Sequence, residues 1–280
     1  MKAKQVRPPL GPGKPSAVAQ GQGAAILYLP EWLLGIIVIG GLTAMGVMLV
    51  LALRPFVSRR LGDEHNAVFS GGFGAVATMY AIIAGLLVFG VFTTFDSAEH
   101  DSSDEAATLV TMYRNAQVFP QPYRDQSQIA IKSYTTSVID DDWPAMAHGQ
   151  GSNETSKALG RLFTVLGAME PSPAWSDQYS AVYGQLNDVV KLRADRIHLG
   201  QSTLSGVYWF LLFAGGFLVI LNLSFIYMES RAMHAIAVGL TSAMLGVVLF
   251  LLVALNHPFQ GDVAISPDSF QNALASMELS

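Results

Sequence analysis

The densest group of ionisable side chains follows the second of four long apolar runs. On a helix, Asp101, Asp104 and Glu105 would share one face, with His100 beside them. Carboxylates in this arrangement can bridge a divalent cation, but the central Gly and terminal Glu of an EF-hand loop are missing at the required spacing. We interpret the group as a solvated helix face and predict no metal site, keeping the three carboxylates as weak candidate ligands.

The other residue types that could do chemistry are scattered. No two histidines have the i, i+4 spacing of a helical metal site. We expect Arg59, Arg60 and His65, and separately His257, to lie at a membrane interface or an ion vestibule, because each lies near the end of an apolar run. The sequence has no nucleophile elbow, Walker loop or dinucleotide fingerprint, and its zero Cys count excludes thiol chemistry. It therefore predicts neither an enzyme nor a bound cofactor.

Composition indicates a membrane protein. Of the 280 residues, 51% are hydrophobic and 13% are charged, whereas a soluble domain carries about 25% charged residues. A helix of about 20 residues crosses a hydrocarbon core, and four runs without Asp, Glu, Lys, Arg or His are long enough: residues 33–53, 73–95, 207–228 and 235–256. The lipid bilayer is thus a partner, and a net charge of −5 argues against nucleic acid as another.

The order of these runs predicts an all-α fold. Four transmembrane helices are expected, with a helical extramembrane domain inserted between the second and third spans. The predicted segments are a disordered basic tail (1–25), the first two transmembrane helices (26–96), the helical domain (97–203), the last two transmembrane helices (204–256) and a C-terminal tail (257–280).

The middle segment has helical periodicity and no sustained strand alternation. Ser152 or Asn153 is expected to cap one of its helices, and the acidic run 140–142 to form a turn and a cap. No Pro separates the segment from the second or third span, so two helices should continue through the membrane boundary. Gly200 and Gly206 could kink the second of these junctions.

The second span suggests a pore. Phe69, Phe73 and Tyr80 fall within about 40° of one another on a helix, with Ala77 and Ala81 beside them. An aromatic stripe next to small residues could narrow a pore into a hydrophobic constriction. The same pattern is typical of ordinary helix–helix packing within one subunit, and the sequence leaves both interpretations open.

Short motifs along residues 28 to 270 resemble a bacterial and plant membrane family called bestrophin-like. They are the stretch from Arg59-Arg60 to His65-Asn66, the stretch Glu105-Ala106-Ala107-Thr108-Leu109 with Tyr113-Arg114, Tyr134 and Trp143, and the residues Arg193, Arg196, Pro258-Phe259 and Gly261-Asp262. The resemblance implies four membrane helices, a helical segment between the second and third, and kinship with bestrophin anion channels. The acidic calcium clasp of animal bestrophins has no counterpart after the fourth span, so calcium gating is not implied.

These features predict a homo-oligomeric ion channel that conducts chloride or another small anion, with the second span lining the pore. Several copies are needed because four helices are too few to surround a channel. The alternative is a non-conducting scaffold or sensor whose helical domain binds a partner. We expect a bacterial inner-membrane protein. The short loops are flanked by Arg54, Arg59, Arg60 and Arg231, which favours cytoplasmic short loops and an extracytoplasmic middle domain. The resemblance implies the reverse orientation, with a cytoplasmic middle domain.

Overall fold

The computed structural model describes residues 30–60 and 63–279, and every regular element among them is helical. Four helices are long and apolar enough to cross a membrane, which confirms four candidate spans. The elements are α1 (Glu31–Arg60), α2 (Asp63–Asn115), the 3₁₀ turn η2 (Ala116–Val118), α3 (Tyr123–Ser137), the π-helical turn η3 (Val138–Asp142), α4 (Trp143–Met146), α5 (Asn153–Gly167), α6 (Ser176–Gln201), α7 (Gly206–Phe225), α8 (Arg231–Leu255) and α9 (Asp268–Glu278).

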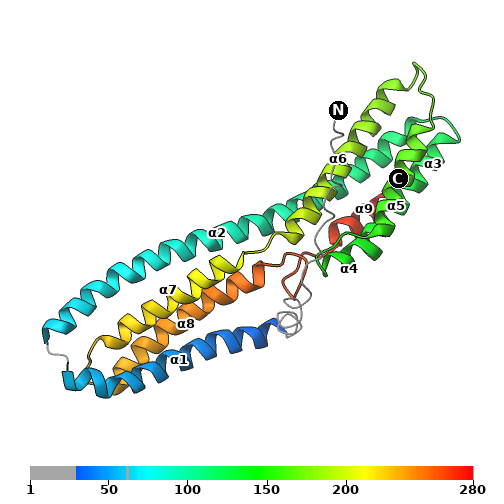
Figure 1. Ribbon diagram of the computed structural model, residues 1–280. Coiled ribbons are helices and arrows are strands. Elements are labelled where there is room, and N and C mark those ends of the chain that lie inside the picture. The colour runs from blue at the N-terminus through cyan, green and yellow to red at the C-terminus, as the bar shows by residue number, and fades with distance from the viewer. Residues whose placement is uncertain (1–29, 61–62, 280) are drawn as a thin grey trace, which may run out of the picture.

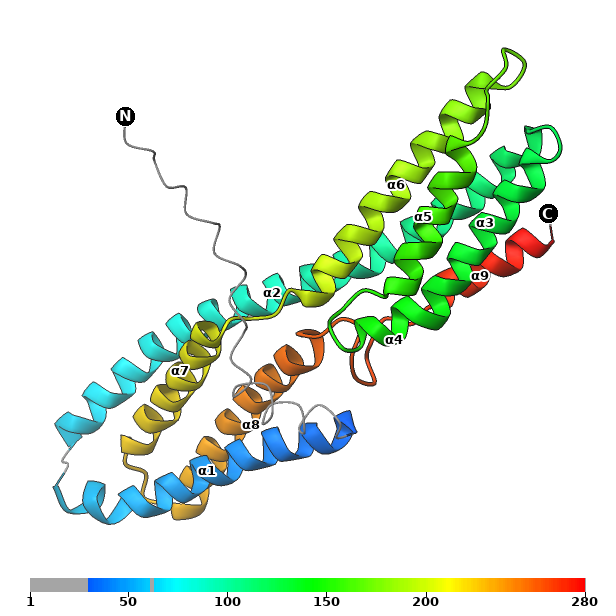
Figure 2. The same cartoon turned by 45° about the vertical axis from the view of Figure 1, so that its right-hand side comes forward.

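The molecule is elongated, and α2 runs along its whole length (Figure 1). At one end α1, the first half of α2, α7 and α8 form the apolar layer of spans. At the other end the second half of α2 packs with α3, α6 and α9, and α5 packs on α3 (Figure 2). We call this second group of helices the distal bundle.

Helix α2 contains 53 residues without a break, which makes it about 80 Å long at 1.5 Å per residue. The expected continuation of the second span into the distal bundle is therefore confirmed. The other junction is broken, since α6 ends at Gln201 and α7 begins at Gly206. The connecting residues are extended rather than kinked at a glycine, and the backbone N–H of Leu204 donates to Asn256 Oδ1 at 2.8 Å.

Small residues set the spacing of the span helices. A Cβ atom added to Gly246 of α8 would lie 2.8 Å from the Cα of Ile39 in α1, so only glycine allows these helices to approach this closely. A Cβ added to Gly215 of α7 would lie 2.6 Å from the ring of Tyr80 in α2. Close packing through glycine is the usual means of helix association in a bilayer, where lipid is as apolar as the side chains.

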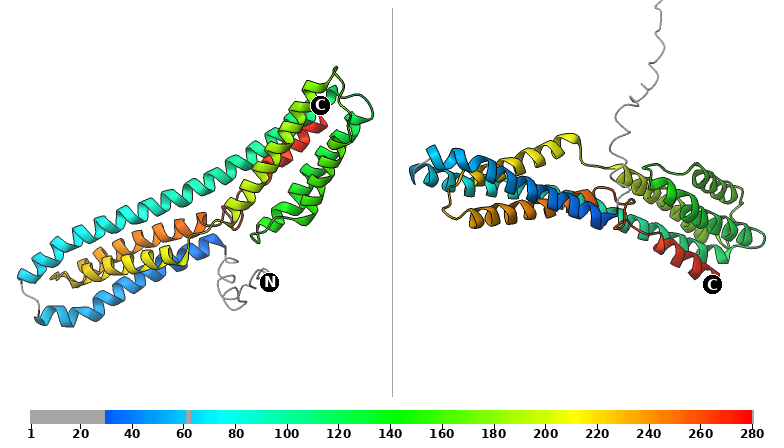
Figure 3. Two further views of the ribbon diagram at one scale, coloured as in Figure 1. Left: turned by 45° about the horizontal axis from the view of Figure 1, so that its top comes forward. Right: turned by 90° about the horizontal axis from the view of Figure 1, so that it is seen from below.

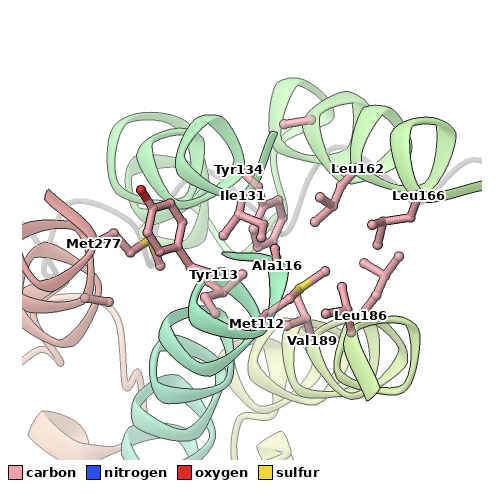
Figure 4. Packing of buried hydrophobic residues seen from close by; sticks show 14 of the residues in the cluster. Met112, Tyr113, Ala116, Ile131, Tyr134, Leu162, Leu166, Leu186, Val189 and Met277 are labelled. Carbon is pink, nitrogen blue, oxygen red and sulfur yellow. The ribbon is translucent and has the colours of Figure 1, made fainter. Parts of the chain in front are cut away.

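The core of the distal bundle is formed by apolar side chains from five helices (Figure 4). Ser152 caps α5 by accepting the backbone N–H groups of Glu154 and Thr155, as expected. The stretch expected as a C-terminal tail contains α9, which lies along α2 and α3 (Figure 3). The buried residues labelled in Figure 4 are Met112, Tyr113, Ala116, Ile131, Tyr134, Leu162, Leu166, Leu186, Val189 and Met277.

Candidate functional site

Two of the predicted pore residues pack inside the subunit. The side chain of Tyr80 is 7% exposed and lies against Gly215 and Gly216 of α7. The ring of Phe69 stacks on that of Phe225, with centroids 5.2 Å apart. In the single chain these two aromatic residues therefore serve helix packing, which is the alternative that the sequence left open.

The other three predicted pore residues, together with Tyr80, line an apolar groove between α2, α7 and α8. Phe73, Ala77 and Ala81 form part of its α2 wall, and its volume is about 420 Å³. Ala81 is exposed, whereas Phe73 and Ala77 are half-buried. Of the five predicted residues, only Phe69 is not among those that line this groove.

The opposite face of α2 is uncovered along the span. Thr78, Ile82 and Phe89 lie about 160–200° around the helix from Tyr80, and all three are exposed, Ile82 by 56% and Phe89 by 65%. Cβ atoms added to Gly71 and Gly85 would meet no other atom within 4 Å. We call this surface the open face of α2; its members are Gly71, Ala75, Thr78, Ile82, Gly85, Phe89, Thr93 and Asp96, of which Gly85 also borders the groove.

The predicted vestibule residues belong to two ends of the span layer. The side chains of Arg59, Arg60 and His65 lie outside the described part of the structure. His257 follows α8 at the end nearer the distal bundle, where its Nε2 lies 3.3 Å from Nδ2 of Asn256. Burial lowers the pKa of His257 below its usual value because it penalises the charged imidazolium.

The weak metal candidates do not act together. Glu105 points into the protein and is fully buried, Asp104 is exposed, and Asp101 is half-buried. Partial burial and the nearby carboxylate of Asp195 raise the pKa of Asp101. No group of three potential metal-ligating side chains occurs among residues whose positions are described.

A buried ion-pair cluster joins four separate elements just beyond the spans. Arg196 of α6 donates from Nε to Glu105 Oε2 of α2 at 2.9 Å and from Nη2 to Asp142 Oδ2 of η3 at 3.1 Å. Arg193 donates to both oxygens of Asp142, each at 2.9 Å. The hydroxyl of Tyr134 in α3 donates to Glu105 Oε1 at 2.6 Å. Two cations thus face two carboxylates, so the cluster is neutral.

The environment of the cluster holds its charges in place. Burial alone would raise the pKa of Asp142, but hydrogen bonds from Arg193, the charge of Arg196 and the Ser152 N–H outweigh it, and the pKa is lowered. Burial would lower the pKa of Arg196, but the opposing Glu105 carboxylate raises it overall. Burial is the main cause that raises the pKa of Tyr134 well above its usual value, and the charge of Glu105 is the second. The hydroxyl therefore keeps its proton and remains a donor.

Sequence reasoning missed this cluster. The expected turn and cap at residues 140–142 is wrong, because Asp142 ends a π-helical turn and is fully buried between two arginines. The available signal was weak. Arg193 and Arg196 are three residues apart on an otherwise amphipathic helix, and that spacing places both on its buried face.

The sequence of the chain matches that of a known protein family. The family described as Bestrophin-like domain matches residues 40–270, well over half of the chain. The chain belongs to the bestrophin-like family. The match begins within α1 and covers the other three span helices and most of the distal bundle of this bestrophin-like protein, including every residue of the ion-pair cluster.

Solved structures share the fold. A single-substitution variant of a bacterial bestrophin homologue from Klebsiella pneumoniae aligns with a TM-score of 0.67 and 14% identity, covering 88% of this chain and 99% of that chain. Another crystal structure of the Klebsiella pneumoniae homologue has a TM-score of 0.66 and 12% identity over 86% and 96% of the chains. A crystal structure of a variant of a membrane protein has a TM-score of 0.68 and 12% identity, covering 87% of this chain and 97% of that chain. No curated protein matches this bestrophin-like sequence.

Proposed function

We propose that this bestrophin-like protein is one subunit of a homo-oligomeric ion channel, in which copies of α2 surround a pore that conducts chloride or another small anion. Bestrophins are anion channels, and the family supports the same activity here. The observation that carries the proposal is the open face of α2, which no other described part of the chain covers. A ring of subunits would place these faces around a common axis.

The open face of α2 carries polar side chains among its apolar ones. Thr78 and Thr93 place hydroxyl oxygens on this face, that of Thr93 donating to the Gly90 carbonyl at 2.9 Å, while Gly71 and Gly85 leave room for a hydrated path. Ile82 and Phe89 would form apolar constrictions that gate by dewetting. In this proposal Phe69, Phe73 and Tyr80 support the pore helix from behind, and Ala77 and Ala81 lie at the flank of the pore.

One observation favours a second candidate, a cation-conducting channel. Beyond the span, α2 exposes the carboxylates of Asp96, Glu99 and Asp104. A ring of such carboxylates attracts cations and repels anions at a pore mouth. The sign of the permeant ion is therefore the first property to measure.

We propose that the protein resides in a bacterial inner membrane. Arg54 and Arg231 flank the short loops, which favours an orientation with the distal bundle outside. Reporter fusions after Ser152 test this orientation. Active alkaline phosphatase at that site supports it, and a fluorescent but phosphatase-silent fusion places the bundle in the cytoplasm.

Planar-bilayer recording with the purified full chain and asymmetric chloride tests the channel proposal. We expect unitary currents that reverse near the chloride equilibrium potential. Reversal near the cation potential would replace anion conduction with the second candidate. If no current appears under any voltage or pH, the protein is a non-conducting scaffold or sensor, the alternative that the sequence also allows.

A further inference from the structure

The segment after α8 connects the spans to the ion-pair cluster. Asn256, the first residue beyond α8, accepts the Leu204 N–H and so holds the broken junction between α6 and α7. Phe259 packs on Gly200 near the end of α6; a Cβ added to that glycine would lie 3.0 Å from the Phe259 ring. Ile265 then accepts the indole N–H of Trp143 at 3.0 Å. Each contact ties this segment to a different part of the boundary.

Helix α9 then covers the guanidinium of Arg196. The Phe270 ring lies 5.4 Å from Arg196 Cζ, and the Trp143 ring lies 5.1 Å from it. The two rings also contact each other, with centroids 5.5 Å apart. The distances from Arg196 Cζ to the two rings are within the range of a cation–π interaction, which is strongest when the cation is desolvated. Phe270 is fully buried, so its ring helps to exclude water from the charges beneath it.

The docking of α9 is coupled to its folding. The helix has 11 residues, and a helix of that length is marginal in water without tertiary contacts. Its buried face consists of Phe270, Ala273 and Met277, and Ser269 Oγ lies 3.2 Å from Ser103 Oγ of α2. A short helix held by few side chains is the kind of element that opens locally at a modest free-energy cost.

We propose that α9 acts as a clasp. By this we mean that its docking over the ion-pair cluster sets how firmly α2 is held to α6 where both helices leave the spans. When α9 is docked, Phe270 keeps Arg196 dry and its bonds to Glu105 and Asp142 strong. When α9 undocks, water reaches Arg196, screens those ion pairs and lets α2 move relative to α6. An effect of the clasp on current rests on the proposed function; the clasp itself does not.

Hydrogen–deuterium exchange of the full chain in lipid nanodiscs tests the clasp. Phe270→Leu removes the ring but keeps an apolar side chain. We expect it to speed exchange about tenfold around residues 101–109 of α2 and 192–200 of α6, with α5 unchanged. Gln271→Ala, at an exposed position of α9, is the matched control and should behave like the wild type. Unchanged exchange in Phe270→Leu, or an equal increase in α5, would overturn the clasp.

A covalent lock provides the opposite test. The chain has no Cys, so Ser103→Cys with Ser269→Cys introduces a single possible disulfide between α2 and α9. The oxidised form should slow exchange at the α2–α6 contact, and reduction should restore it. Equal exchange in both forms would contradict the clasp. Currents recorded from the same protein test the proposed function separately. If the hydrogen-exchange rates differ between the oxidised and reduced forms but the currents do not, the clasp is supported and its effect on conduction is contradicted.

Discussion

Asp142 receives hydrogen bonds from two arginines and from the Ser152 N–H while it is fully buried. A buried ion pair adds little compared with apolar packing, but removing one partner leaves the others charged and unpaired. The cost of a substitution here therefore exceeds the cost of losing one ordinary hydrogen bond.

We predict that Asp142→Asn lowers the free energy of unfolding by about 3–5 kcal/mol, because Arg193 and Arg196 then share a single buried carboxylate. Thermal unfolding in detergent measures the loss. Asp140→Asn, two residues earlier and exposed, is the control and should unfold like the wild type. Equal stability of the two variants would show that the cluster does not hold the bundle.

The lowered pKa of Asp142 fixes the sign of a pH effect. A carboxyl group whose pKa is depressed by folding contributes stability above its unfolded pKa of about 3.9, and that stability is lost as pH falls through the folded value. We expect the wild type to lose stability steeply below about pH 4 and Asp142→Asn to show a shallower loss. Parallel pH profiles of unfolding temperature would contradict this assignment.

At the scale of elements, the pairing of α1 with α8 is controlled by glycine. Gly246→Ala should force the helices apart, because the added Cβ would meet the Cα of Ile39 at 2.8 Å. Gly41→Ala adds the same methyl group where nothing lies within 4 Å, and should be neutral or slightly stabilising, since Ala favours a helix over Gly by about 1 kcal/mol. Thermal unfolding in detergent compares the two; a Gly246→Ala protein as stable as Gly41→Ala would refute tight packing.

The elements themselves were largely predictable from the sequence. Charge-free length predicted the four span helices, and the absence of Pro predicted that α2 continues into the distal bundle. The break between α6 and α7 could not be predicted, because nothing in residues 202–205 forbids a helix. The Asn256 side chain, 52 residues away in sequence, bonds the Leu204 N–H, and this is a tertiary contact that local patterns do not contain.

At the scale of the whole molecule, α2 connects the span layer to the distal bundle and is also the proposed wall of the pore. The angular positions of side chains on a helix predicted the aromatic stripe of Phe69, Phe73 and Tyr80. They cannot tell which side of the helix packs against α7. That depended on Gly215 and Gly216, whose missing side chains admit the Tyr80 ring. The ion-pair cluster was hidden for a similar reason, since Glu105 and Arg196 are 91 residues apart.

Cysteine accessibility during bilayer recording tests most directly whether the open face of α2 lines a pore. Because the chain has no Cys, a charged thiol reagent acts only at the introduced position. In Thr78→Cys, on the open face, the reagent should block or alter the current. In Tyr80→Cys, behind α2 against α7, it should have no effect. Modification that changes the current of Tyr80→Cys but not of Thr78→Cys would contradict the account.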